Sequence, residues 1–223
     1  MDRYIDNNET QVYGPKLSAN IRRKFTEMGP VQALMLHCCT QLDAATETMR
    51  VAMVGERNAG SVRSALAEEK LPAVAAARSE LKTFSLMLTA HKSDEKQPWN
   101  GDPNLFVPGG IGAVGKGARA LKVATETARA QLEADLHVPG RAGWIERLDA
   151  QLESLGPLVD RTDGVTKAHH DALSEQSSEK KAWLRAYRGA CLIVEGVLTS
   201  LGRESEYASM VPHLNARGSR KLT

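Results

Sequence analysis

The segment PGGIGAVGKGA, residues 108–118, has a composition that could bind phosphate. Three spaced glycines followed by Lys116 fit the first part of a phosphate-binding loop, in which backbone N–H groups and a lysine contact the anion. The next residue is Gly117, where that loop needs a Ser or Thr hydroxyl for magnesium. The sequence predicts no sheet to carry such a loop. We therefore interpret the segment as a glycine-rich entry to a helix.

Histidine and cysteine side chains are candidate metal ligands. His37, Cys38 and Cys39 are consecutive, and consecutive side chains on a helix fan out by about 100°, so the three cannot close on one ion. None of the six histidines belongs to a Glu-x-x-His or His-x-x-x-His motif. We expect no metal and no other cofactor. The alternative is a long-range site that joins His37 or Cys38 to His169 or Cys191.

Basic side chains could bind anions. Lys181, Arg185 and Arg188 are four and three residues apart, which places them on one side of a helix; we call these three residues the basic row. Residues 22–24, Arg-Arg-Lys, form a second cluster. Such surfaces can follow a phosphate backbone. The net charge is only +2 and the interleaved aromatic residues fall on the apolar side, so the sequence argues against nucleic acid.

The sequence contains no recognisable catalytic pattern. It has no nucleophile elbow and no Ser, His and Asp set that spacing would bring together. The carboxylate pairs Asp43–Glu47 and Glu126–Glu133 are explained more simply as surface charge than as an acid–base pair. We expect a protein that is not an enzyme.

The elements that must position these residues are predicted to be helices. Apolar residues make up 42% and aromatic residues 4% of the chain, a balance that suits close-packed helices better than sheets. The clearest apolar row, with spacings of three and four, lies in a helix expected from about 157 to 201 and ended by Gly202. Its members are Trp183, Tyr187, Ala190, Val194, Val197 and Leu201.

Similar rows predict further helices over about 17–28, 30–54, 61–91, 114–138 and 141–155. Glycines at 55 and 60 are expected to form a turn, and Gly156-Pro157 to end one helix and start the next. At Pro72 the chain either kinks or begins a new helix. The expected fold is all-α: an antiparallel bundle of four long helices with additional short helices.

The bundle domain is expected to span 17–202, with a long central loop at 92–112. A flexible N-terminal arm, 1–16, and a C-terminal tail, 203–223, flank it. Arm, loop and tail carry apolar side chains that we call the hooks; segments of this kind often become ordered on a partner. The hooks are Tyr4, Ile5, Tyr13, Trp99, Phe106, Tyr207, Met210, Val211 and Leu214.

These features favour a non-enzymatic structural subunit of a larger protein assembly, with contacts made by the terminal arms and the central loop. Its partners would be copies of itself or other protein subunits. The alternatives are a ligand- or metal-binding helical bundle and a nucleic-acid-associated protein that uses the basic helix faces. The sequence leaves open whether the hooks dock on their own chain. Three cysteines in no disulfide pattern, and no apolar leader or spanning segment, predict a cytoplasmic protein without a membrane partner.

Overall fold

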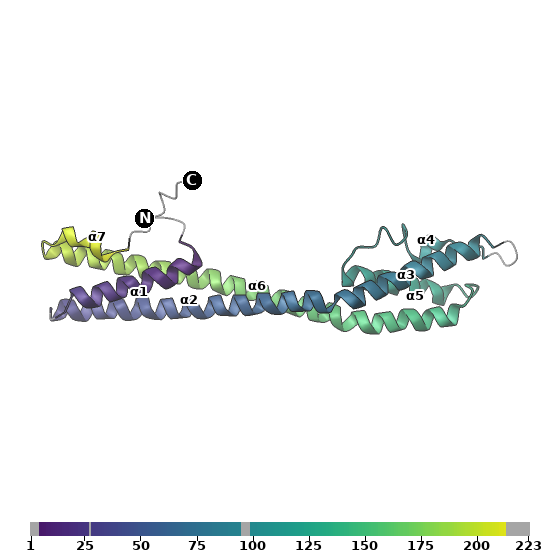
Figure 1. The fold of residues 1–223 in the computed structure, drawn as a ribbon, viewed down its shortest axis with the longest axis horizontal. Helices are drawn as coiled ribbons and strands as arrows, with labels where there is room; N and C mark the ends of the chain where they lie inside the picture. The colour runs from purple at the N-terminus through teal and green to yellow at the C-terminus, as the bar shows by residue number, and fades with distance from the viewer. Residues whose placement is uncertain (1–4, 27, 95–98, 213–223) are drawn as a thin grey trace, which may run out of the picture. The chain divides into compact units, whose positions relative to one another are not determined.

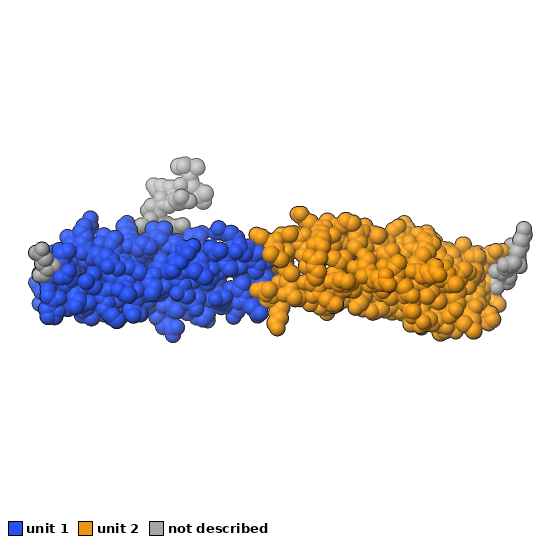
Figure 2. All heavy atoms as spheres, turned by 90° about the horizontal axis from the view of Figure 1, so that it is seen from below, with its two compact units in different colours: residues 1–60, 169–223 blue, residues 61–168 orange. Residues whose placement is uncertain are grey.

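A computed structural model describes residues 5–26, 28–94 and 99–212. All regular secondary structure in these residues is helical, as the sequence predicted (Figure 1). The chain divides into two compact units, coloured separately in Figure 2. Unit 1 comprises residues 1–60 and 169–223, and unit 2 comprises residues 61–168. Two units with separate cores replace the single bundle domain expected over 17–202.

Unit 1 is built from segments of three long helices and two short ones. They are α1 (Asn7–Lys24), α2 (Pro30–Glu69) up to residue 60, α6 (Arg141–Ser200) from residue 169, η1 (Glu204–Glu206) and α7 (Tyr207–Met210). Helix α1 begins at Asn7, within the stretch 1–16 for which the sequence predicted a flexible arm. Asp6 and Glu9 form a capping box, in which each carboxylate accepts the other residue's backbone N–H at 2.8 Å.

The core of unit 1 centres on two stacked aromatic rings of α6. Trp183 and Tyr187 have ring centroids 4.9 Å apart and planes inclined by 16°. The indole Nε1 of Trp183 donates a hydrogen bond of 3.0 Å to the hydroxyl of Thr46 on α2. Gly14 on α1 lies against that contact: a Cβ there would be 2.4 Å from the Thr46 hydroxyl. The three long helices therefore meet at one point that requires a glycine.

Unit 2 contains the end of α2, α3 (Leu71–Lys92), α4 (Pro103–Phe106), α5 (Ala118–Ala134) and α6 up to residue 168. Helix α3 begins beside Pro72, one of the two outcomes that the sequence left open. The ring centroid of Phe84 on α3 lies 5.8 Å from that of Phe106 and 5.1 Å from that of Trp144. These aromatic contacts join α3, α4 and α6 in one core.

Two expected helix breaks are absent from the described structure. Helix α2 continues through Gly55 and Gly60 to Glu69, and α6 continues through Gly156-Pro157. A glycine in an exposed helix costs only about 1 kcal/mol relative to alanine, and tertiary packing can offset even a proline. Leu155 and Val159, on either side of Pro157, are both buried in the core of unit 2. Packing on both sides thus keeps α6 continuous.

Candidate functional site

The hooks near the two ends of the chain pack into unit 1. Ile5, Met210 and Val211 are buried in its core, and Tyr13 and Tyr207 pack partly buried against it. The tail is held by polar contacts as well. Asn20 donates a hydrogen bond of 2.7 Å to the carbonyl of Met210, and the Tyr187 hydroxyl donates one of 3.3 Å to the carbonyl of Pro212. Tyr4 and Leu214 lie outside the described residues.

The hooks of the central loop pack into unit 2. Trp99 and Phe106 are 5% and 2% exposed, with ring centroids 5.7 Å apart. The Trp99 indole donates a hydrogen bond of 3.0 Å to the carboxylate of Asp135, just after α5. The described hooks therefore pack wholly or partly into the chain's own cores; their role at a partner interface stays a prediction. Side chains buried in this way present little surface to another chain.

The long-range metal site proposed around the histidines is not assembled. His169 lies beside α2, with its Nε2 3.6 Å from a carboxylate oxygen of Glu56. His37 lies nineteen residues before Glu56 on the same helix, which is about 28 Å along its axis. His37 and His169 therefore cannot share an ion. No group of three His, Cys, Asp or Glu side chains in the described ranges is arranged to hold a metal.

The cysteines are buried thiols. Burial raises the pKa of Cys38 and Cys39, and it raises the pKa of Cys191 to about 11. Cys39 Sγ donates a long hydrogen bond of 3.5 Å to the carbonyl of Ser18. All three cysteines are free. Because the thiolate is the reactive form, neutral buried thiols act here as small apolar side chains.

The glycine-rich segment 108–118 presents carbonyl groups to a cation. The guanidinium of Arg78 on α3 donates to the carbonyls of Ile111 and Val114 at 3.2 Å and to that of Gly115 at 3.4 Å. A phosphate-binding loop would turn its N–H groups inward instead. The three hydrogen bonds from Arg78 therefore attach the segment 108–118 to α3.

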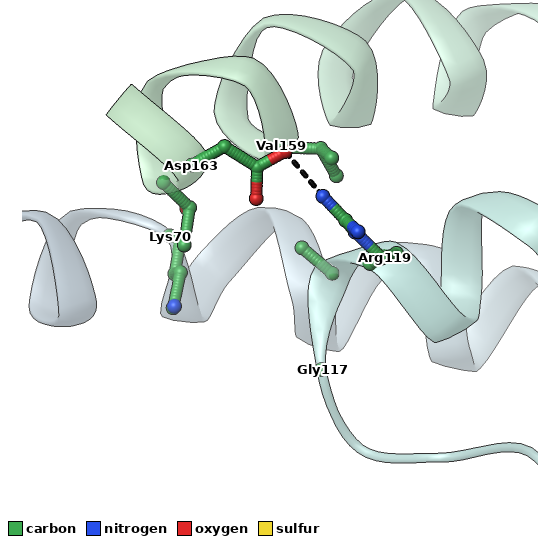
Figure 3. A pocket seen from close by; sticks show the side chains of 7 residues that line it. Lys70, Gly117, Arg119, Val159 and Asp163 are labelled. Carbon is green, nitrogen blue, oxygen red and sulfur yellow. Dashed lines mark hydrogen bonds and ion pairs between the residues drawn. The ribbon is translucent and has the colours of Figure 1, made fainter. Parts of the chain in front are cut away.

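A small hollow of about 160 Å³ lies in unit 2 where α5 begins (Figure 3). Its charged lining residues are Lys70, Arg119 and Asp163. Arg119 and Asp163 form an ion pair, and Figure 3 shows the Lys70 amino group pointing away from that pair. The hollow's carboxylate is thus already neutralised by an arginine. We therefore regard this hollow as a packing feature of unit 2.

The structure brings the three members of the basic row together at the surface of unit 1. Lys181, Arg185 and Arg188 are exposed on α6 and line a shallow concavity of about 320 Å³ in unit 1, with Ser178 and Leu184. Within the described part of the chain none of the three cations makes an ion pair or side-chain hydrogen bond. The local sequence explains this, because no residue three or four positions from any of them is acidic.

The second basic cluster, residues 22–24, is different because all three of its side chains have polar partners. Arg22 pairs with Asp43 at 2.7 Å, Lys24 pairs with Glu206 at 3.1 Å, and Arg23 donates to a side-chain oxygen at 3.3 Å. The hydrogen bond to Asp43 is the main cause that raises the pKa of Arg22. This cluster stabilises unit 1 internally, whereas the basic row faces solvent.

Comparison with known proteins adds no identification: no family model, curated protein or solved structure matches this chain. Within the ranges that the structure describes, no helix combines the length and apolar character needed to cross a membrane. The basic row is therefore the candidate binding surface of the described structure.

Proposed function

We propose that the protein is a non-enzymatic subunit of a protein assembly and that the basic row binds an acidic surface of another protein chain. The observation that carries this proposal is the set of three exposed cations, which line one concavity and have no anionic partner among the described residues. Charges of one sign, gathered without local compensation, attract an oppositely charged partner and orient it.

The core side of α6 fixes the basic row in position. Trp183 and Tyr187, which lie between the cations in sequence, are 0% and 1% exposed and form the stacked centre of unit 1. A helix held by such packing presents its outward side chains at defined spacings. The partner therefore meets cations attached to an ordered backbone, which lowers the entropic cost of binding.

An acidic protein surface suits the basic row better than a nucleic acid does. Proteins that bind single strands usually add aromatic side chains on which bases stack. The aromatic residues interleaved with the row are buried in the core, so they are unavailable for stacking. The chain's net charge of +2 is also small for a nucleic-acid-binding domain. Nucleic-acid binding remains an outcome that the experiment below would reveal.

Two finer expectations from the sequence belong to this proposal. We propose antiparallel packing for α1 and α2, because only residues 25–29 connect them. We also propose a cytoplasmic location, since three free buried thiols suit a reducing compartment. In the proposed assembly the hooks stabilise the two units, and the basic row makes the contact with the partner chain.

The test is a binding titration with a defined acidic probe. A fluorescein-labelled helical peptide with glutamates at positions i, i+4 and i+7 would be titrated with the full chain, and fluorescence anisotropy recorded. Replacing Lys181, Arg185 and Arg188 by alanine should weaken binding by about 3-fold to 150-fold, because three exposed ion pairs contribute about 0.2–1 kcal/mol each.

The matched control replaces three other exposed cations, Lys16, Arg63 and Lys82, by alanine. This control changes the net charge equally and should bind the peptide as the wild type does. Equal affinity of the basic-row variant and the wild type would contradict the proposal. Tighter binding of a single-stranded oligonucleotide, lost in the same variant, would favour the nucleic-acid alternative instead.

A further inference from the structure

Three carboxylates on α6 form an acidic counterpart to the basic row. Glu146, Glu153 and Asp160 follow one another at intervals of seven residues and are all exposed in unit 2. We call these three residues the acidic row. None of them has an ion pair or side-chain hydrogen bond within the described part of the chain. No residue three or four positions away from any of them is basic.

Neighbouring carboxylates of the same helix show that partners are available on another side of α6. Asp149 forms an ion pair with Arg129, and Asp163 forms one with Arg119; both arginines belong to α5. The carboxylates that meet α5 are therefore neutralised within unit 2. Those of the acidic row are left to solvent, as the cations of the basic row are in unit 1.

The two rows are opposite in charge, and the basic row matches one half of the acidic row in length. Lys181 and Arg188 are seven residues apart, and so are Glu146 and Glu153; seven residues span about 10.5 Å of helix. Two helices laid side by side could therefore bring both ends of the basic row to successive carboxylates of the acidic row. Arg185 would then lie between two carboxylates, within reach of either.

We infer that the partner of the basic row is a second copy of this chain, which presents its acidic row. The inference depends on the proposed function and names the acidic surface that the proposal requires. Because each chain carries both rows, the contact joins two different patches. It can close reciprocally as a dimer or continue as an open chain. A contact made of exposed ion pairs is weak individually and is screened by salt.

Complementary charge reversal tests the inference. One variant carries Lys181→Glu, Arg185→Glu and Arg188→Glu; the other carries Glu146→Lys, Glu153→Lys and Asp160→Lys. Sedimentation velocity at low ionic strength should show wild-type association and a monomer of 24.2 kDa for each variant alone. An equimolar mixture of the two variants should associate again, because the reversed basic row of one variant then faces the reversed acidic row of the other.

Two controls show whether a loss of association comes from the position of the reversed charges, from the change in net charge or from misfolding. Reversal of Lys16, Arg63 and Lys82 to glutamate changes the charge equally and should leave association intact. Far-UV circular dichroism would verify helix content, and glutamine variants at the same positions replace any reversed variant that fails to fold. Raising the salt from 0.05 M to 1 M shortens the screening length to about 3 Å and should disperse the wild-type complex.

Three results would overturn the inference: a monomeric wild type at low salt, variants that associate alone as the wild type does, or a mixture that stays monomeric. The acidic-peptide titration distinguishes this failure from that of the proposed function. If the peptide binding still requires the basic row, the row binds a different acidic protein and only the second copy is excluded. If the peptide binding does not require the row, both proposals fail.

Discussion

The hydrogen bond between Trp183 and Thr46 gives a sharp test of the unit 1 core. The Thr46 hydroxyl accepts from the indole at 3.0 Å and itself donates to the carbonyl of Leu42 at 2.8 Å. Thr46 is 7% exposed and Trp183 is fully buried. The substitution Thr46→Val keeps the shape of the side chain and removes the acceptor. The indole N–H would then be buried without a partner.

The expected loss of stability follows from these contacts. A buried donor left unsatisfied costs about 1–3 kcal/mol, and the methyl group that replaces the hydroxyl offsets up to about 0.8 kcal/mol of that cost. We therefore expect Thr46→Val to lower the free energy of unfolding by about 1–2 kcal/mol. Helix propensity contributes little, because Thr and Val have similar values.

A second threonine of α2 supplies the matched control. The Thr48 hydroxyl also donates to a carbonyl one turn earlier, Ala44, at 3.0 Å, but it is exposed and meets no indole. Thr48→Val should change stability by less than about 0.5 kcal/mol. Urea unfolding followed by circular dichroism, with amide hydrogen exchange of α1 and α3 to separate the two units, measures both effects. Equal stability of the two variants would refute the reasoning.

Three further predictions concern backbone packing, the fastened loop and pH. Gly14→Ala should lower the melting temperature, because the added Cβ would lie 2.4 Å from a hydroxyl oxygen, whereas Gly55→Ala, with no atom within 4 Å, should raise it. Arg78→Met should accelerate amide exchange across residues 108–117, since it frees three carbonyls. Hydrogen bonds from Arg203, the larger cause, and from Lys24 lower the pKa of Glu206 from 4.5 to about 2. Because that folded-state pKa is depressed, its contribution to holding α7 is present above about pH 4.5 and is lost as pH falls toward 2, which a carboxyl NMR titration would follow.

The helical fold could be read from the sequence where periodicity and end signals agreed. Gly202 adopts φ +67° directly after the last turn of α6. This helix end was predicted, because such an end favours the left-handed backbone that glycine adopts easily. The helix expected over 17–28 instead ends at Lys24. Of the apolar row around Trp183, the four members up to Val194 are buried in the core of unit 1, Val197 is partly buried and Leu201 is exposed.

Other helix boundaries could not be read so directly. Gly55 and Pro157 carry strong local signals for a break, yet the helices continue because packing on either side exceeds the local cost. The start of α1 did have a local signal. The pair Asp6 and Glu9 has the spacing of a capping box, and reading it would have placed the helix start near residue 7.

The candidate site was predictable in part. The basic row follows from spacing alone, since residues four and three apart share a helix side. Its lack of partners follows partly from the local sequence and partly from the fold, which provides partners for Arg22 and Lys24 elsewhere. Whether the hooks dock on their own chain depended on tertiary contacts between residues far apart in sequence. No local pattern encodes those contacts.

The most direct test of the account is the solution mass of the full chain by light scattering at low and at high ionic strength. Association through the two charged rows predicts a mass above 24.2 kDa at low salt that falls to the monomer value at high salt. A monomer under both conditions would contradict self-assembly. A multimer that persists in high salt would contradict the electrostatic contact and indicate an apolar interface.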